Sequence, residues 1–399
     1  MQRLTLNPIE YVFTGSGSQP ITFAFSYSAA LDAEVLRRGL AATLISFPMV
    51  RSQLARTSDT EYAFHLTEAG LTFDVARTEL EFQRSRKVEQ YVTPASSSEG
   101  QPLTRIGLSQ TPKGSVLAVS MSHALADGFS YFHFLSSWAR TCRGARILEP
   151  SLGREALNPT PHTGAEEISA RDVREKCGLF YAGDRGGAAA EPGDCERFFI
   201  SAEVIKSHMG STEQLRGSSL TENDVIVAFL WKKYLTSWIT SEDNPDTYVT
   251  CPVDVRRILP GLPRNYFGCA LCFATAASDL NALAMRSVGE LAVQVKASVN
   301  RIRGTYIPAS MDILDGLRRQ KGLAALEHVH LRHPQHGLIV TNLTRMPMKD
   351  IDFGFGAPVD FSAYVEVRGG AAILPADGGV EVIVVRPAGA GIPSDASVI

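Results

Sequence analysis

The stretch SHALADGFSYF, residues 122–132, joins the end of a strand to the start of a helix. The residues from Val116 to His123 have β-strand character, and His123 shares one face with the apolar residues two, four and six positions before it. Asp127-Gly128 then breaks the strand, and apolar side chains at helical spacing follow. This stretch predicts a strand, a tight turn and an amphipathic helix.

The imidazole of His123 is suited to proton transfer at this position. It titrates near neutral pH, so it can take a proton from an attacking hydroxyl or amine. A core histidine that is hydrogen-bonded to a backbone carbonyl is the alternative interpretation of an isolated HxxxD pattern. Other features of the chain must therefore decide between the two.

Length and composition are those of a globular protein. The 399 residues predict two or three domains, and 44% hydrophobic and 20% charged residues are ordinary values. The net charge is -3, and no basic run interleaved with aromatics occurs, so nucleic-acid binding is not expected. The sequence has no apolar run of membrane-spanning length and no apolar signal core, and its six cysteines are scattered. We therefore expect reduced thiols, no membrane association and a cytoplasmic location.

The order of the elements predicts a mixed α/β fold with two lobes. Residues 1–142 form an N-terminal lobe that carries His123, residues 143–196 a crossover linker, and residues 197–399 a C-terminal lobe. Helices are expected over residues 31–47, 84–93, 170–177 and 287–303, and from Thr221 onward. Strands are expected over residues 4–13, 21–28, 197–200, 248–253, 338–342 and 380–387.

The residues Thr221-Glu222-Asn223-Asp224 form a capping-box pattern at the start of a helix. The free amides of this helix start, with Ser218 and Ser219 just before it, can hold a phosphate group. A capped helix with nothing bound remains the alternative.

Several familiar sites are not supported. Cys269 and Cys272 have CxxC spacing, but they lie in an apolar run without a second ligand pair, and the histidines between His328 and His336 fit a solvated helix end and loop. A GxSxG elbow is missing, as are dinucleotide and P-loop fingerprints. We therefore expect no metal ion. A histidine without a nucleophile partner predicts direct transfer of an acyl group, with buried donors such as Thr341 and Asn342 for the tetrahedral oxygen.

Four stretches, in order, resemble the BAHD acyltransferase family of the larger chloramphenicol acetyltransferase and condensation-domain superfamily. Residues 123–128, HALADG, resemble its HxxxDG motif, and residues 352–356, DFGFG, resemble its DFGWG motif. Residues 252–268, with PVDVR and NYFG, and residues 340–345 resemble two intermediate regions. The resemblance covers nearly the whole chain.

This resemblance implies two chloramphenicol-acetyltransferase-like lobes, each a mixed sheet flanked by helices, with a channel between them. It implies an acyltransferase of secondary metabolism that uses acyl-CoA, or another pantetheine thioester, as co-substrate and needs no further cofactor. The acceptor would be a small-molecule alcohol or amine, and the protein a monomer.

The resemblance also implies a role for each matching residue. His123 would be the general base, and Asp127 would turn away from substrate and pair with an arginine, for which Arg256 is the candidate. Thr341 and Asn342 would face the channel near the transferred carbonyl. Ser219 and Thr221 would lie near the phosphopantetheine arm. The remaining motif residues would be structural: Gly128, Asp254, Asp352, Phe353, Gly354 and Gly356.

The chain departs from the family pattern at several positions. Leu343 stands where many members have a tryptophan, Val255 replaces a glycine and Phe355 replaces the tryptophan of DFGWG. The chain is also shorter than plant members and lacks their closing helix, which suggests a bacterial-type relative. Two alternatives stay open. One is a condensation-type enzyme that takes its acyl group from a carrier protein, although Ser122 occupies the place of its usual second histidine. The other is a binding scaffold without catalysis.

Overall fold

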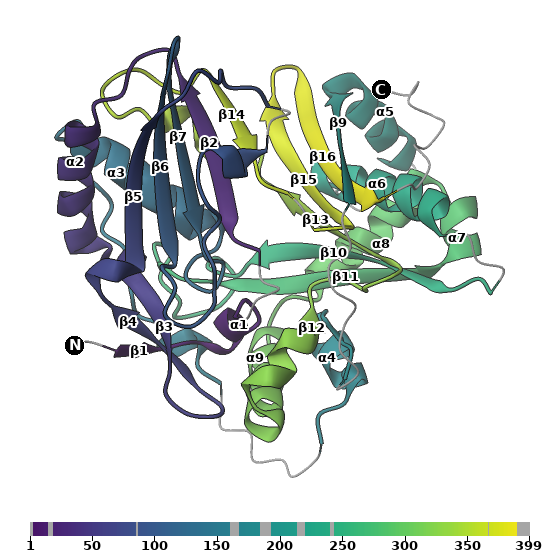
Figure 1. Ribbon diagram of the computed structural model, residues 1–399. Coiled ribbons are helices and arrows are strands. Elements are labelled where there is room, and N and C mark those ends of the chain that lie inside the picture. The colour runs from purple at the N-terminus through teal and green to yellow at the C-terminus, as the bar shows by residue number, and fades with distance from the viewer. Residues whose placement is uncertain are drawn as a thin grey trace.

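The computed structural model describes residues 3–14, 19–84, 87–159, 167–183, 193–213, 220–239, 243–365 and 367–388. Two large β-sheets lie side by side, each with helices packed against it (Figure 1). The mixed α/β fold with two sheet-and-helix lobes is therefore confirmed.

The N-terminal sheet has five strands in the order β14-β2-β7-β6-β5. Its central strand, β7, is buried along its whole length, as its nearly continuous apolar sequence GSVLAVSM requires. Helices α2 and α3 pack together against this sheet, and Trp138 Nε1 on α3 donates to Leu36 O on α2 at 3.0 Å (Figure 1). The elements are β2 (Ile21–Tyr27), α2 (Ala33–Ser46), β5 (Leu71–Arg77), β6 (Thr104–Thr111), β7 (Gly114–Met121), α3 (Gly128–Cys142) and β14 (Asp360–Ala363).

The C-terminal sheet has six strands in the order β11-β10-β13-β15-β16-β9, with the β10–β13 and β13–β15 pairs parallel. Helices α5, α6 and α8 pack on it (Figure 1). The strands are β9 (Gly193–Ser201), β10 (Asp246–Asp254), β11 (Leu271–Asp279), β13 (Gly337–Asn342), β15 (Gly370–Ala376) and β16 (Gly379–Pro387). The helices are α5 (Ala202–Glu213), α6 (Glu222–Trp238), α7 (Leu280–Met285) and α8 (Val288–Asn300).

Smaller elements fill the lower part of the molecule in Figure 1. A three-stranded sheet has the order β1-β4-β3, and β8 pairs with β12. These elements are β1 (Arg3–Thr5), α1 (Pro8–Tyr11), β3 (Ser52–Arg56), β4 (Tyr62–Leu66), α4 (Ala170–Cys177), β8 (Phe180–Tyr181), α9 (Tyr306–Lys321) and β12 (Val329–His330). Short 3-10 helices span Pro48–Arg51, Glu68–Gly70, Val88–Gln90, Glu155–Leu157, Leu323–His328 and Met348–Asp350.

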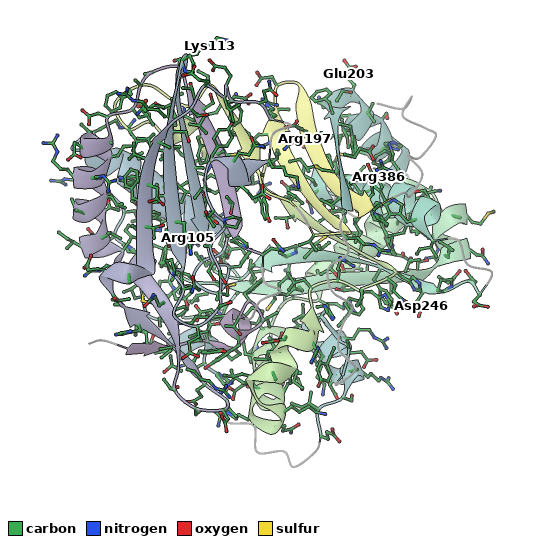
Figure 2. All side chains as sticks on the ribbon, viewed as in Figure 1. Arg105, Lys113, Arg197, Glu203, Asp246 and Arg386 are labelled. Carbon is green, nitrogen blue, oxygen red and sulfur yellow. The ribbon has the colours of Figure 1, made fainter. Side chains whose placement is uncertain are left out.

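A segment from the C-terminal half of the chain adds a strand to the N-terminal sheet. Strand β14 comes from the C-terminal part of the sequence, yet it pairs with β2 in the N-terminal sheet, with Asp360 opposite Ser26. Arg197 on β9 adds a second link, because its Nη2 donates to Ser362 Oγ on β14 at 2.9 Å. Figure 2 shows Arg197 on the side of the C-terminal sheet that faces the N-terminal lobe. A division at residue 197 therefore does not separate the two sheets.

Two local predictions are wrong. The expected helix over residues 84–93 is, in the described residues, only the 3-10 turn Val88–Gln90. The expected strand over residues 4–13 breaks at Asn7, whose side chain and Glu10 form a capping box for α1. Both errors arise because short apolar stretches carry no decisive period. The tail, residues 389–399, lies outside the described residues.

Candidate active site

His123 lies in the turn between β7 and α3. The Ser122 amide donates to Leu103 O at 2.8 Å, and the Leu125 amide donates to Ser122 O at 3.0 Å, which fixes the backbone on both sides of His123. The residues on either side, Ser122 and Ala124, are fully buried, whereas His123 is partly exposed. His123 is thus the partly exposed side chain between two buried neighbours in this turn.

The imidazole of His123 packs against an aromatic ring. Phe13 lies face to face with it, with ring centroids 4.3 Å apart and planes 13° apart. Within the described part of the chain Nδ1 is enclosed and has no hydrogen-bond partner, so Nε2 is the accessible nitrogen. Burial lowers the pKa of His123 to about 4, against the opposing effects of Asp127 and of the residue's own backbone. At pH 7 the ring is therefore neutral and able to accept a proton.

Asp127 and Arg256 form the predicted pair. Arg256 Nη1 donates to Asp127 Oδ2 at 2.7 Å and Nη2 donates to Oδ1 at 3.0 Å. The Ser130 and Ala270 amides each donate to the same carboxylate at 2.9 Å. Asp127 also caps α3, so one side chain fixes both the start of this helix and its contact with the C-terminal lobe.

The Arg256 guanidinium is surrounded by further acceptors. Its Nε donates to Tyr266 O at 3.1 Å, Nη2 to Gly268 O at 3.0 Å, and Nη1 to Asp254 Oδ1 at 3.0 Å. Gly268 has a φ of 152°, and a Cβ there would meet the Tyr266 hydroxyl at 2.3 Å, so this position requires glycine. Residues 254–268 thus form a collar that holds the arginine.

The end of β13 lies close to the start of α3. A Cβ on Gly128 would lie 3.8 Å from Leu343 Cδ2, so the residue that replaces the expected tryptophan packs beside the glycine of the HxxxDG stretch. Thr341 and Asn342 come just before it and are partly exposed. The structure therefore brings the predicted donor residues to the same region as the turn that carries His123.

Asn342 and Thr341 differ in their partners. Asn342 Nδ2 donates to Asn223 Oδ1 on α6 at 2.9 Å, and its Oδ1 accepts from the amide and hydroxyl of Thr344 at 2.9 and 2.7 Å. The Thr341 hydroxyl forms no hydrogen bond with another described residue, and it points to the opposite face of β13 because strand side chains alternate. The Thr341 hydroxyl is therefore the one available to a bound group.

The predicted capping box at α6 is present. The Thr221 hydroxyl donates to Asp224 Oδ2 at 2.7 Å and accepts from the Asp224 amide at 3.3 Å. This hydroxyl is thus already occupied by its own helix, and its contact with a pantetheine arm stays a prediction. Ser219, the other residue predicted for coenzyme A, lies outside the described residues.

The DFGFG stretch lies at the other end of α3. Asp352 Oδ1 accepts from the amides of Gly354 and Gly356 at 2.7 and 3.0 Å, and Oδ2 pairs with Arg143 at 3.2 Å. Phe353 is buried edge-on to Trp138, with ring centroids 4.8 Å apart. Helix α3 has 15 residues, and at 1.5 Å per residue it separates this stretch from the His123 turn by roughly 20 Å.

Other chemistries find little support. Among the described residues, no group of three His, Cys, Asp or Glu side chains is arranged to hold a metal ion. Within the same residues, every helix is too short or too polar to cross a bilayer. The histidine-rich segment is half-buried rather than a solvated loop, because His333 stacks on Tyr248 and His336.

Comparison with known proteins decides the family. A model described as the Transferase family matches residues 22–390. The chain belongs to this family. Its relatives include a hydroxycinnamoyl-CoA:5-hydroxyanthranilate N-hydroxycinnamoyltransferase of Avena sativa, 27% identical over 82% of this chain and 76% of that protein. Hydroxycinnamoyltransferase 2 of Oryza sativa subsp. japonica is 27% identical over 87% of this chain and 82% of its own.

Solved structures agree with the fold. The F. graminearum protein TRI101, complexed with coenzyme A and deoxynivalenol, matches with a TM-score of 0.75 at 16% identity and covers 97% of this chain and 96% of its own. Vinorine synthase matches with a TM-score of 0.71 at 18% identity, over 97% of this chain and 91% of that one. The two chloramphenicol-acetyltransferase-like lobes and the acyltransferase activity expected of a Transferase family member are confirmed.

Sequence reasoning missed two residues that contact the candidate site. Phe13 was placed in a strand and received no role, and Asn223 was treated only as part of a cap. Neither lies in a motif with a chemical signature. Phe13 stacks on His123 and Asn223 bonds to Asn342 only because the fold brings these distant segments together.

Proposed function

We propose that the protein transfers an acyl group from coenzyme A to a hydroxyl or amine of a small molecule, with His123 Nε2 as the general base. One observation carries this assignment: a neutral, partly exposed imidazole lies in a turn that is clamped between the two lobes by Asp127 and Arg256. Such a group is suited to accept a proton from a neutral nucleophile.

The transfer proceeds without a covalent acyl-enzyme. His123 has no serine, cysteine or lysine bonded to it among the described residues, so the acceptor itself is the nucleophile. Nε2 removes the acceptor proton as the acceptor O or N attacks the thioester carbonyl. The tetrahedral oxyanion then collapses, the C–S bond breaks, and the imidazolium returns the proton to the leaving thiolate.

The developing oxyanion needs a hydrogen-bond donor. Thr341 is the better candidate, because its hydroxyl is not bonded to another described residue, whereas the Asn342 amide already donates to Asn223. Leu343 offers no polar group in place of a tryptophan. We therefore assign the oxyanion contact to Thr341 and a supporting role to Asn342.

The relatives support the choice of substrates. Names such as putrescine hydroxycinnamoyltransferase 1 of Oryza sativa subsp. japonica and agmatine coumaroyltransferase-1 of Hordeum vulgare indicate amine acceptors for those proteins, and other names specify a hydroxycinnamoyl-CoA donor. For this chain we propose an acyl-CoA donor and leave the acceptor at the class of hydroxyl or amine. Thr221 and Ser219 are proposed to lie beside the pantetheine arm.

The test is release of free coenzyme A. The purified protein is incubated with a panel of acyl-CoA donors, including coumaroyl-CoA and acetyl-CoA, and with pooled alcohols and amines; thiol release and product masses are measured. Replacing His123 by Ala should lower turnover by about 10²–10⁴-fold, whereas His328→Ala, outside the site, should not. Full turnover by the His123→Ala protein would refute the proposal.

Two competing possibilities are separated by the same assay. Transfer from an acylated carrier protein but not from free acyl-CoA would indicate the condensation-type enzyme. Absence of thiol release with every donor would indicate a scaffold. Cytoplasmic location, a monomeric state and a bacterial-type origin also remain proposals; the last rests on the departures at Leu343, Val255 and Phe355, while the relatives named above are plant proteins.

A further inference from the structure

The orientation of the His123 ring matters for its role as a general base. A catalytic imidazole is ordinarily oriented by a hydrogen bond to its second ring nitrogen, which fixes both the tautomer and the plane of the ring. Here Nδ1 is enclosed and meets no acceptor from another described residue, and the Asp127 carboxylate is committed to Arg256. Apart from the residue's own backbone, the plane of the ring is therefore set by what packs against it.

The Phe13 ring is placed to do this. It is almost parallel to the imidazole, with an interplanar angle of 13° and a centroid separation of 4.3 Å, which is close stacking contact. Phe13 is only 4% exposed, and on β11 the buried ring of Phe273 lies 6.4 Å from it. The imidazole thus lies against a ring that is itself supported by the C-terminal lobe.

The backbone that carries Phe13 is held by several hydrogen bonds. The Phe13 amide donates to Glu10 O at 3.1 Å at the end of α1. The fully buried Glu10 carboxylate accepts from the Asn7 amide at 2.8 Å and from Arg154 Nη1 at 2.9 Å. The Tyr266 hydroxyl, in the collar around Arg256, donates to the other Glu10 oxygen at 3.3 Å.

Both lobes hold this segment. Asn7 Nδ2 donates to Cys269 O at 3.3 Å, next to the collar, and the Arg318 guanidinium of α9 lies 4.7 Å from the centre of the Tyr11 ring. The same collar therefore anchors Asp127, which follows His123, and Glu10, which precedes Phe13. The imidazole and the ring stacked on it are fixed relative to one common support.

We propose that Phe13 is a positioning residue for His123: its ring fixes the plane of the imidazole so that Nε2 faces the incoming nucleophile. This inference rests on the proposed function, because it assigns His123 the role of base. It differs from a simple packing role in one respect. A side chain of similar size without a flat ring would preserve burial but would let the imidazole rotate out of its plane.

The experiment compares Phe13→Leu, which keeps most of the volume, with Phe13→Tyr, which keeps the ring. The matched control is Phe82→Leu, which removes a ring stacked on Tyr91 in a separate small cluster. Misplacement of a catalytic group lowers the rate of the chemical step. Phe13→Leu should therefore lower kcat by about tenfold and leave the KM for acyl-CoA nearly unchanged. Phe13→Tyr should restore most of kcat, and Phe82→Leu should leave it unchanged.

A second readout does not require turnover. In protein labelled with ¹³C-histidine, the His123 signal is assigned by its loss in His123→Gln and followed through a pH titration. The ring current of Phe13 should shift the His123 ring protons upfield in the wild type and in Phe13→Tyr, and this shift should disappear in Phe13→Leu. Wild-type kcat in Phe13→Leu, or a rise in KM alone, would overturn the inference.

The two readouts separate the inference from the proposed function. If the wild type turns over no donor, the proposed function fails, and the titration alone then judges the stack. Identical shifts and titration curves in the wild type and Phe13→Leu would overturn the positioning role whatever the activity. A changed curve in Phe13→Leu that Phe13→Tyr restores would support it.

Discussion

Asp127 and Arg256 join the two lobes through two parallel hydrogen bonds of 2.7 and 3.0 Å, with both side chains buried. The pair is bidentate, the geometry in which a guanidinium binds a carboxylate most specifically. Because Asp127 follows His123 by four residues and caps α3, the position of the imidazole depends on an arginine about 130 residues away in the chain. The catalytic turn is therefore a product of both lobes.

Breaking this pair should lower stability and activity together. Asp127→Ala leaves the buried guanidinium with only the half-exposed Asp254 carboxylate beside it, and Arg256→Ala leaves a buried carboxylate without its cation, so each should cost about 3–5 kcal/mol of unfolding free energy. Arg256→Lys should restore little, because an ammonium cannot form the bidentate contact. Denaturant unfolding and turnover by the single and double variants measure both effects.

The double variant provides the check on this prediction. Two residues in direct contact should give non-additive losses, so Asp127→Ala with Arg256→Ala should cost clearly less than the two single changes combined. Strict additivity would count against the pairing. The exposed Arg171–Glu175 pair on α4 is the control, and Arg171→Ala should leave the unfolding free energy nearly unchanged.

The pH dependence should reflect the lowered pKa of His123. Burial lowers its pKa from 6.5 to about 4, so the neutral base should persist well below neutral pH. We expect kcat/KM to be level between about pH 6 and pH 8 and to fall only on approach to the lowered pKa. An acid limb centred near 6.5 would contradict the lowered pKa of the ring.

The same shift makes a prediction about stability. Between pH 6.5 and about 4 the unfolded chain binds a proton at His123 that the folded chain does not. The unfolding free energy should therefore fall as the pH is lowered through this window. His123→Gln should remove this contribution, which thermal melts of the two proteins at several pH values would reveal.

The oxyanion assignment separates Thr341 from Asn342. Thr341→Val keeps the shape and removes the free hydroxyl, so it should lower kcat by about 10²-fold with little change in KM. Asn342→Ala should lower stability as well, because it leaves Asn223 and Thr344 without their partner. Equal kcat values for Thr341→Val and the wild type would show that another group donates the hydrogen bond to the oxyanion.

The DFGFG stretch should affect folding and not chemistry. Phe353→Ala removes a buried ring that packs on Trp138, and such a change costs about 3–5 kcal/mol. The kcat per folded molecule should be unchanged, since α3 separates this stretch from His123. Active-site titration alongside melting curves would show it, and a kcat loss in fully folded protein would contradict a purely structural role.

Residues in chemical motifs and helices with capping residues could be predicted from the sequence. His123, Asp127 and Arg256 stand in motifs, and α2 and α6 each have a capping residue, Asp32 and Thr221, followed by many apolar residues. Phe13 and Asn223 were missed because their roles arise from contacts over distances in the chain that no local pattern encodes. The false helix at residues 84–93 shows that weak apolar spacing does not suffice without caps.

Strand β14 has a practical consequence. The Val359 amide donates to Ser26 O and the Tyr364 amide to Thr22 O, so this short strand and its flanking residues pair with one edge of β2. A fragment that ends before residue 359 would display a long unpaired edge, which invites self-association. The protein should consequently melt in a single cooperative step, and engineers who wish to build chimaeras with a foreign C-terminal half must retain residues 359–364.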